Sequence, residues 1–296
     1  MKKLIVLCLT LISLGSFAQN NYTVSSPDKK IVLTYDANKN TYTIAYDGKT
    51  VLRESKLGVV REDEDFSKNL KLVKVSAPTL ISDSYTMLNA KKKNITYKAT
   101  QRIIETATPS GKKMNIIFRI ANDGVAFQYE FPEKSTDVKK ITAEATTFHF
   151  NEGTKAWLQP KAEAQTGFEH TNPSYEDYYR SNIATGTSSP GANGWIYPAL
   201  FKDNDTWLML TEAGLGRTYA GTALQQHSPD SEYKVNFPQA AEVFTNGKAT
   251  LLPESTLPWR TPWRIIAIGS LKTIAESTLG TDLALPEKKM DFSFVK

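Results

Sequence analysis

One segment in the middle of the chain gathers side chains that could recognise a sugar or hold a cation. Between Trp157 and Tyr179 carboxylates are interspersed with aromatic rings, and prolines and asparagines indicate a structured loop region. Aromatic faces can stack on sugar rings, and carboxylate oxygens bind hydroxyl groups or Ca²⁺. The competing interpretation is structural, with the tyrosines in the core and the carboxylates in water. The residues concerned are Trp157, Glu163, Phe168, Glu169, His170, Tyr175, Glu176, Asp177, Tyr178 and Tyr179.

A second dense cluster of tryptophan and arginine runs from Leu257 to Arg264. Tryptophan beside arginine can form a binding surface, but a guanidinium can equally stack on an indole where a strand begins. For this cluster we expect the structural role.

Histidines are too few and too widely spaced to suggest a metal site. The chain has only His149, His170 and His227, no two of them at metal-ligand spacing, and no His-Glu-x-x-His sequence. A Gly-x-Ser-x-Gly nucleophile motif and a phosphate-binding loop are also missing from the sequence. His149 lies between Phe148 and Phe150 in a strand-like pattern, which predicts a structural role for it, and His227 is expected in a solvated loop.

The composition is that of an ordinary globular protein with a mixed surface charge. Of 296 residues, 40% are hydrophobic and 23% are charged, which excludes a mainly disordered chain and a multi-span membrane protein. The net charge is +5, or +3 without Lys2 and Lys3, and the short runs Lys91–Lys93 and Glu62–Asp65 have opposite signs. Because no basic face stands out, we predict no nucleic-acid partner.

The N-terminus has the features of a secretory signal peptide over residues 1–18. A basic start, Met1–Lys3, precedes an apolar stretch, Leu4–Leu14, that is too short to span a bilayer. Small residues within Ser16–Ala18 predict cleavage before Gln19 and export to the periplasm or the medium. The only cysteine, Cys8, lies inside this segment, so the mature chain would contain neither disulfides nor thiol chemistry.

The elements that must position these side chains are predicted to be strands throughout. From Met114 to Phe131, apolar residues alternate on two arms separated by Asn122–Gly124, which predicts a hairpin with one buried face. Asp47–Gly48 marks another hairpin turn, and only Leu271–Leu279 suggests a helix. Many short strands separated by turns indicate an all-β sandwich. Further strands are expected at 30–35, 41–46, 97–106, 195–201, 207–211 and 263–268.

Several segments, taken in order, resemble the N-terminal domain of glycoside hydrolase family 97, the α-glucosidase and α-galactosidase family of Bacteroidetes. The hairpin at Asn122–Phe131 is the most specific of them. Order and spacing fit over nearly the whole mature chain. The matching segments are Ser25–Ile31, Asn122–Phe131, Tyr175–Tyr179, Trp207–Gly221, Trp263–Ile266 and Thr281–Ala284.

The resemblance implies a large antiparallel β-supersandwich of the galactose-mutarotase-like type over residues 19–285. In the family this domain precedes a (β/α)₈ barrel that supplies the catalytic carboxylates, so no catalytic residue is assigned in this chain. The domain adds one glutamate to a Ca²⁺ site at the shared active centre, and Glu176 matches that position, with Glu169 as the competing assignment. Residues 286–296 would begin a linker to the barrel, whose pattern this sequence lacks. The implied substrate is an α-linked oligosaccharide.

Two other functions remain open at this point. The first is a free-standing mutarotase-like sugar epimerase, which needs a general acid and a general base, often His and Glu, across an exposed sugar ring. Only His149 and His170 are available for it, and neither has a recognisable partner spacing. The second is a simple carbohydrate-binding module without a role in an active site. No apolar run of transmembrane length follows the N-terminal segment, so no membrane span is expected.

The predicted export signal can be tested directly. Mass spectrometry of protein recovered from the periplasm or medium should find Gln19 as the first residue, because Ser16 and Ala18 occupy the small-residue positions before the cleavage point. Exported protein that still begins at Met1 would contradict this interpretation.

Overall fold

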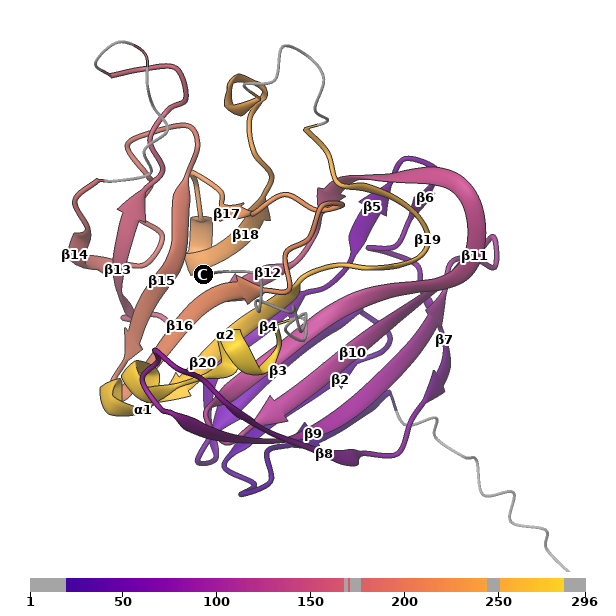
Figure 1. Ribbon diagram of the computed structural model, residues 1–296, viewed down its shortest axis with the longest axis horizontal. Coiled ribbons are helices and arrows are strands. Elements are labelled where there is room, and N and C mark those ends of the chain that lie inside the picture. The colour runs from indigo at the N-terminus through magenta and orange to yellow at the C-terminus, as the bar shows by residue number, and fades with distance from the viewer. Residues whose placement is uncertain (1–19, 168–169, 171–176, 244–250, 285–296) are drawn as a thin grey trace, which may run out of the picture.

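The computed structural model describes residues 20–167, 170, 177–243 and 251–284. Strands packed in two layers make up nearly all of it (Figure 1), and no helix in these ranges is long and apolar enough to cross a membrane. Two short helices, α1 (Leu271–Glu276) and α2 (Leu279–Asp282), replace the single helix expected at Leu271–Leu279. The predicted all-β, antiparallel, galactose-mutarotase-like supersandwich is confirmed.

The smaller layer is a four-stranded antiparallel meander in the order β1-β2-β3-β4. Its strands alternate buried and less buried residues, so one face packs against the larger layer. Asp47 and Gly48, with φ of 46° and 77°, form the tight turn that the Asp-Gly pair predicts. The strands are β1 (Asn21–Ser25), β2 (Ile31–Asp36), β3 (Thr41–Tyr46) and β4 (Lys49–Lys56).

The larger layer is a 16-stranded sheet whose main path runs β12-β18-β17-β15-β16-β20-β11-β10-β9-β7. Its first strands are β5 (Val59–Arg61), β6 (Glu64–Asp65), β7 (Lys71–Val75), β8 (Thr79–Thr86), β9 (Asn94–Ala107), β10 (Lys113–Ala121), β11 (Gly124–Glu144) and β12 (Thr147–His149). The remainder are β13 (Lys155–Pro160), β14 (Arg180–Ala184), β15 (Trp195–Asp203), β16 (Thr206–Ala213), β17 (Ala223–Leu224), β18 (Glu232–Asn236), β19 (Glu254–Arg260) and β20 (Trp263–Gly269). Two 3₁₀ turns are η2 (Pro229–Ser231) and η3 (Ala240–Glu242).

The core forms where the predicted hairpin faces the smaller layer. Strands β10 and β11 pair from Asn115 to Ala121, and their alternating aromatic residues are buried. The ring centroids of Tyr42 and Phe127 lie 5.4 Å apart, and those of Tyr35 and Phe118 lie 6.1 Å apart, in tilted arrangements that aromatic pairs favour. These contacts join the two layers through their largest side chains.

Arg264 carries a positive charge into this interior. Its side chain is 1% exposed, and it donates to both carboxylate oxygens of Glu144 at 2.8 and 2.6 Å and to Glu212 Oε2 at 2.6 Å. The Tyr219 hydroxyl donates to Glu144, and Thr222 donates to Glu212. Burial alone would lower the pKa of Arg264, but the two carboxylates raise it well above its usual value.

The position of this ion cluster in the sheet explains its importance. On the backbone, Arg264 pairs with Phe127 near the start of β11, whereas its side chain holds Glu144 at the end of the same strand. The strand curves over the sandwich between these two points (Figure 1). In the Trp-Arg segment at 257–264, Trp259 and Trp263 are also buried, and Arg119 lies over the Trp263 ring at 4.7 Å, in agreement with a structural role.

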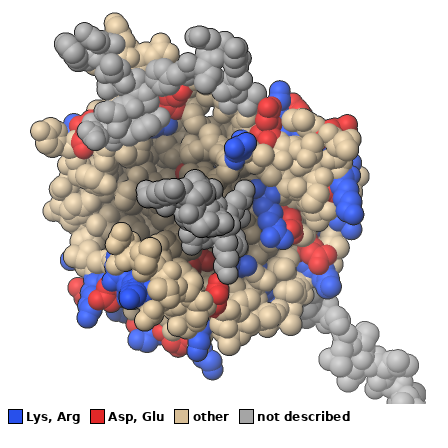
Figure 2. Space-filling view, in the orientation of Figure 1, with Lys and Arg blue, Asp and Glu red and all other residues tan. Residues whose placement is uncertain are grey.

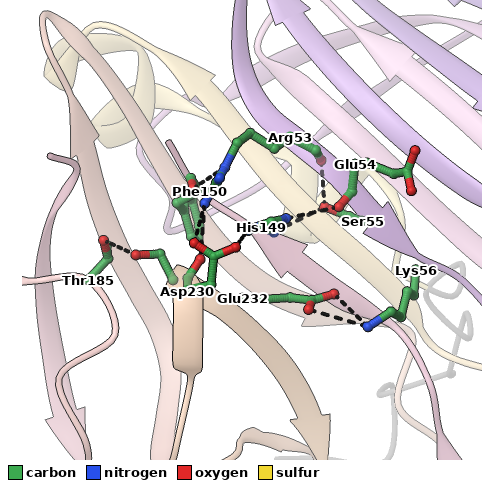
Figure 3. A network of polar contacts seen from close by, with 10 residues as sticks. Arg53, Glu54, Ser55, Lys56, His149, Phe150, Thr185, Asp230 and Glu232 are labelled. Carbon is green, nitrogen blue, oxygen red and sulfur yellow. Dashed lines mark hydrogen bonds and ion pairs between the residues drawn. The ribbon is translucent and has the colours of Figure 1, made fainter. Parts of the chain in front are cut away.

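A second polar network joins the smaller layer to η2 (Figure 3). Arg53 of β4 donates to the Phe150 carbonyl at 2.8 Å and forms an ion pair with Asp230 at 3.2 Å. His149 Nε2 lies 3.0 Å from the second oxygen of Asp230, and its Nδ1 lies 3.1 Å from the Glu54 carbonyl. The hydrogen bond from Arg53 lowers the pKa of Asp230. His149 therefore has a structural role here, as the sequence pattern predicted.

The buried ion cluster generates a prediction about stability. Arg264→Met would leave two buried carboxylates without a counter-charge, and we expect the free energy of unfolding to fall by about 3–5 kcal/mol at pH 7. The loss should shrink as the pH is lowered, because an unpaired buried carboxyl prefers its neutral form. Denaturant titrations at several pH values measure both effects.

The control for this experiment is Lys272→Met, which removes an exposed ion pair with Glu276. It should change the free energy of unfolding by less than about 1 kcal/mol. Equal losses for the two variants would show that the Arg264 cluster does not stabilise the fold.

Candidate functional site

The segment that the sequence singled out begins where β13 ends, and its first residue is a buried lysine. Lys161 Nζ lies 2.7 Å from Glu242 Oε1 and 3.0 Å from Oε2, and the two side chains are only 7% and 4% exposed. Glu242 belongs to η3, which lies 81 residues further along the chain. A buried ion pair of this kind needs good geometry to offset the loss of hydration, so it fixes both loops in one arrangement.

A turn that precedes β15 supports Lys161 from the other side. The Gly194 carbonyl accepts from the Lys161 amide at 2.9 Å and from the Ser189 hydroxyl at 2.8 Å, and Asn193 donates to the Ala162 carbonyl at 2.9 Å. Gly194 has a φ of 80°, and a Cβ there would lie 1.8 Å from the Leu224 carbonyl oxygen. Only glycine fits this position, so the turn that holds the Lys161 backbone depends on it.

The short turn η3 is joined to the loop after β13 by a second contact. Gln165 donates to the Ala241 carbonyl at 2.9 Å, beside the Lys161–Glu242 pair. Glu242 also accepts from the Gln239 amide at 3.0 Å, which closes the first turn of η3. The two loops, residues 161–167 and 239–243, are therefore held together as one unit, which we call the loop platform.

The residues predicted to do chemistry are only partly within the described ranges. Glu176, Glu169, Tyr175 and Phe168 lie outside them. Tyr178 is 87% exposed and Tyr179 is 44% exposed, so the interpretation of these tyrosines as core residues is wrong for this pair. The pattern misled because tyrosine is as common at wet interfaces as in cores.

The exposed groups at this end of the molecule could bind hydroxyls rather than carry out a reaction alone. Glu163, Asp177 and Tyr178 are exposed, and they offer oxygen acceptors and one phenol. Among the described residues, no three His, Cys, Asp or Glu side chains converge as a metal site would require. Those residues therefore do not form a complete Ca²⁺ site, and any calcium here would need Glu176 or ligands from elsewhere.

The histidines are distributed over different parts of the structure. His149 belongs to the network with Asp230, and His170 contacts the Gln165 carbonyl at 2.9 Å. His227 is exposed and contacts the Ser188 hydroxyl at 2.9 Å. None of these printed contacts joins a histidine to a glutamate side chain across an open surface, which is the arrangement that sugar epimerisation would require.

Sequence reasoning missed the most ordered part of this site. The Lys161–Glu242 pair carries no local motif, because its members lie 81 residues apart and each resembles a surface charge. The one available signal was the position of Lys161 directly after the apolar end of a strand.

A family comparison covers nearly all of the described chain. The glycosyl-hydrolase 97 N-terminal domain matches residues 24–286. Among curated proteins, the chain is 25% identical over 300 residues to a probable retaining alpha-galactosidase of Streptomyces bingchenggensis (strain BCW-1), and the match covers 98% of this chain and 43% of that protein.

Solved structures agree with this result. A beta-arabinopyranosidase superimposes with a TM-score of 0.86 at 35% identity, over 92% of this chain and 44% of that one. A glycoside hydrolase family 97 enzyme from Pseudoalteromonas sp. strain K8, solved in complex with panose, gives a TM-score of 0.76 at 24% identity, over 93% and 40% of the two chains. This chain thus spans less than half the length of these relatives.

The Lys161–Glu242 pair generates a prediction about the loop platform. Glu242→Gln would leave a buried ammonium without its carboxylate, and we expect backbone amides in 161–167 and 239–243 to exchange with solvent at least about tenfold faster. Hydrogen exchange read by mass spectrometry measures this, with peptides of β10 as the internal reference. Lys39→Met, which breaks an exposed pair with Glu54, should leave these peptides unchanged. Unchanged exchange in Glu242→Gln would disprove the proposed ordering role.

Proposed function

Because the chain belongs to the glycosyl-hydrolase 97 family through its N-terminal domain, we propose that it is the β-sandwich half of an α-glycosidase active centre. In this proposal the sandwich itself is not catalytic. It presents the loop platform to a (β/α)₈ barrel, and the barrel supplies the two carboxyl groups that glycoside hydrolysis needs on either side of the scissile bond. The observation that supports it best is the family match over residues 24–286, at less than half the length of the relatives.

The physical part played by the loop platform follows from its buried ion pair. A glycosidase gains rate by holding its substrate in one orientation, and loops that shift by an ångström lose that advantage. Lys161 and Glu242 anchor the loop that leads from β13 towards Tyr178. We propose that exposed groups of this loop, Glu163 and Asp177 among them, accept hydrogen bonds from sugar hydroxyls at the edge of the active centre.

Glu176 is proposed as a Ca²⁺ ligand of the assembled enzyme. Calcium takes six to eight oxygen ligands, so one glutamate from this chain would complete a site built mainly from the barrel. Bound there, the ion would fix carboxylates and sugar oxygens in place. Support comes from the Tyr-Glu-x-x-Tyr sequence at 175–179 and from the exposed acidic and phenolic groups beside it, Asp177 and Tyr178.

The substrate is proposed to be an α-galactoside or a sugar of the same ring stereochemistry. The structural relative with 35% identity is a beta-arabinopyranosidase, and the curated relative is a probable retaining alpha-galactosidase. A β-L-arabinopyranoside has the ring configuration of an α-D-galactoside without the C6 hydroxymethyl group. The relative solved with panose has the lower identity, 24%, so we place α-glucosides second. Export through the segment at 1–18 would bring the enzyme to such sugars in the periplasm or medium.

A domain exchange tests this proposal. Residues 19–285 would replace the corresponding domain of the beta-arabinopyranosidase, and nitrophenyl glycosides would report hydrolysis with and without calcium. The 296-residue chain alone should release no nitrophenol, whereas the chimera should be active. Glu176→Gln keeps the shape of the side chain and removes its charge, so we expect at least about tenfold loss of activity and weaker calcium dependence.

Glu169→Gln is the matched control, because it makes the same change seven residues earlier in the same segment. Its activity and calcium dependence should stay at the level of the unchanged chimera. A loss with Glu169→Gln but not with Glu176→Gln would move the ligand to Glu169. Hydrolysis by the isolated chain would overturn the non-catalytic role itself.

A further inference from the structure

Two tryptophans lie together on the outer face of the larger sheet, away from the loop platform. Trp157 of β13 and Trp207 of β16 have ring centroids 5.0 Å apart and planes inclined by 41°. Strand β15 runs between them, and its register pairs Trp157 with Leu200 and Lys202 with Trp207. The rings therefore meet above β15 on one face of the sheet, and both remain partly exposed.

The indoles form the floor of an open hollow of about 490 Å³. Lys202 Nζ lies 5.4 Å from the centre of the Trp207 ring, so part of that ring carries a cation while the rest stays available. No carboxylate lines the hollow. Its lining residues are Gly153, Lys155, Trp157, Asn182, Lys202, Asn204 and Trp207.

The polar rim of the hollow consists of amides and ammonium groups. Asn182 and Asn204 have φ of 57° and 51° at exposed positions, Asn204 in the hairpin turn between β15 and β16. Lys155 is exposed beside them. In Figure 2 the left-hand part of the visible face, where β13, β15 and β16 lie, is largely tan, and charged side chains gather towards the rim.

We propose that this hollow, the tryptophan platform, is a non-catalytic binding site for a pyranose unit of an oligosaccharide. An aromatic floor with a few hydrogen-bonding groups at its rim is the usual composition of a ligand site. A pyranose ring matches it because one face of the ring consists of C–H groups that pack on an indole, while its equatorial hydroxyls point sideways to amides and ammonium groups. The proposed function suggests which sugars to test, but the site depends only on this geometry.

The tryptophan platform is separate from the loop platform. Lys155 and Lys161 lie at opposite ends of β13, and six residues of extended strand span about 20 Å. A glycan held at the tryptophan platform would keep neighbouring sugar units near the other end of the same strand. Such tethering raises the local concentration of substrate without any new contact at the active centre.

Titration of the full chain with oligosaccharides tests the proposal. Tryptophan fluorescence and indole N–H shifts in NMR spectra would be followed with an α-galactosyl oligosaccharide, panose and a uronic-acid oligosaccharide. The unchanged chain should bind at least one of them with a millimolar or lower dissociation constant. Trp157→Ala and Trp207→Ala should each weaken binding at least tenfold, and Trp207→Phe, which keeps an aromatic face, should weaken it less.

The matched control is Tyr22→Ala. Tyr22 is another half-buried aromatic ring with a cation above it, Arg102 at 5.6 Å, but it lies on β1. This variant, and Glu176→Gln, should bind as the unchanged chain does, which separates this site from the proposed active centre. Thermal unfolding of every variant shows whether the fold is kept.

Three outcomes would overturn the proposal. They are no binding of any of the three sugars, binding that survives replacement of both tryptophans, and equal weakening by Tyr22→Ala. Preference for the uronic-acid oligosaccharide would assign the two lysines a role in recognising acidic sugars, whereas preference for a neutral one would assign recognition to the asparagines.

Discussion

The guanidinium of Arg264 is the interaction on which the architecture most depends. It sits 1% exposed between the layers and is held by Glu144 and Glu212. Because Arg264 pairs through its backbone with the start of β11 and through its side chain with the end of that strand, one residue sets the path of the longest strand in the fold. The aromatic core around Phe127 fills the space that this path encloses.

From this cluster the order of the sheet extends outward to both sites. Strand β20 pairs with β16, β16 with β15, and β15 with β13. The tryptophan platform lies across the last three strands, and Lys161 lies at the end of β13. Both sites therefore rest on regular strands, and the loop platform adds its own ion pair where the regular structure stops. A binding surface built in this way is ordered before any ligand arrives, which lowers the entropy cost of binding.

The sequence predicted the strands and several turns correctly, and it failed at partnerships. Alternation identified the β10–β11 hairpin, and Asp47–Gly48 marked its turn, because both signals are local. Alternation also assigns Trp157 to one face of its strand, but it does not say that Trp207 lies beside it, 50 residues later. The same limit applies to Lys161 and Glu242. Charges that are neutralised across such distances look like ordinary surface residues until the fold brings them together.

The buried ion cluster also limits how a lineage could vary this domain. Arg264, Glu144 and Glu212 share one site, so replacing any one of them alone leaves the others as uncompensated buried charges. Such a triad changes as a set or stays as it is, and intermediate sequences would be purged. The residues that face solvent on β13, β15 and β16 carry no such penalty. Preference for a particular sugar could therefore diverge rapidly between descendants while the interior of the sandwich stayed almost frozen.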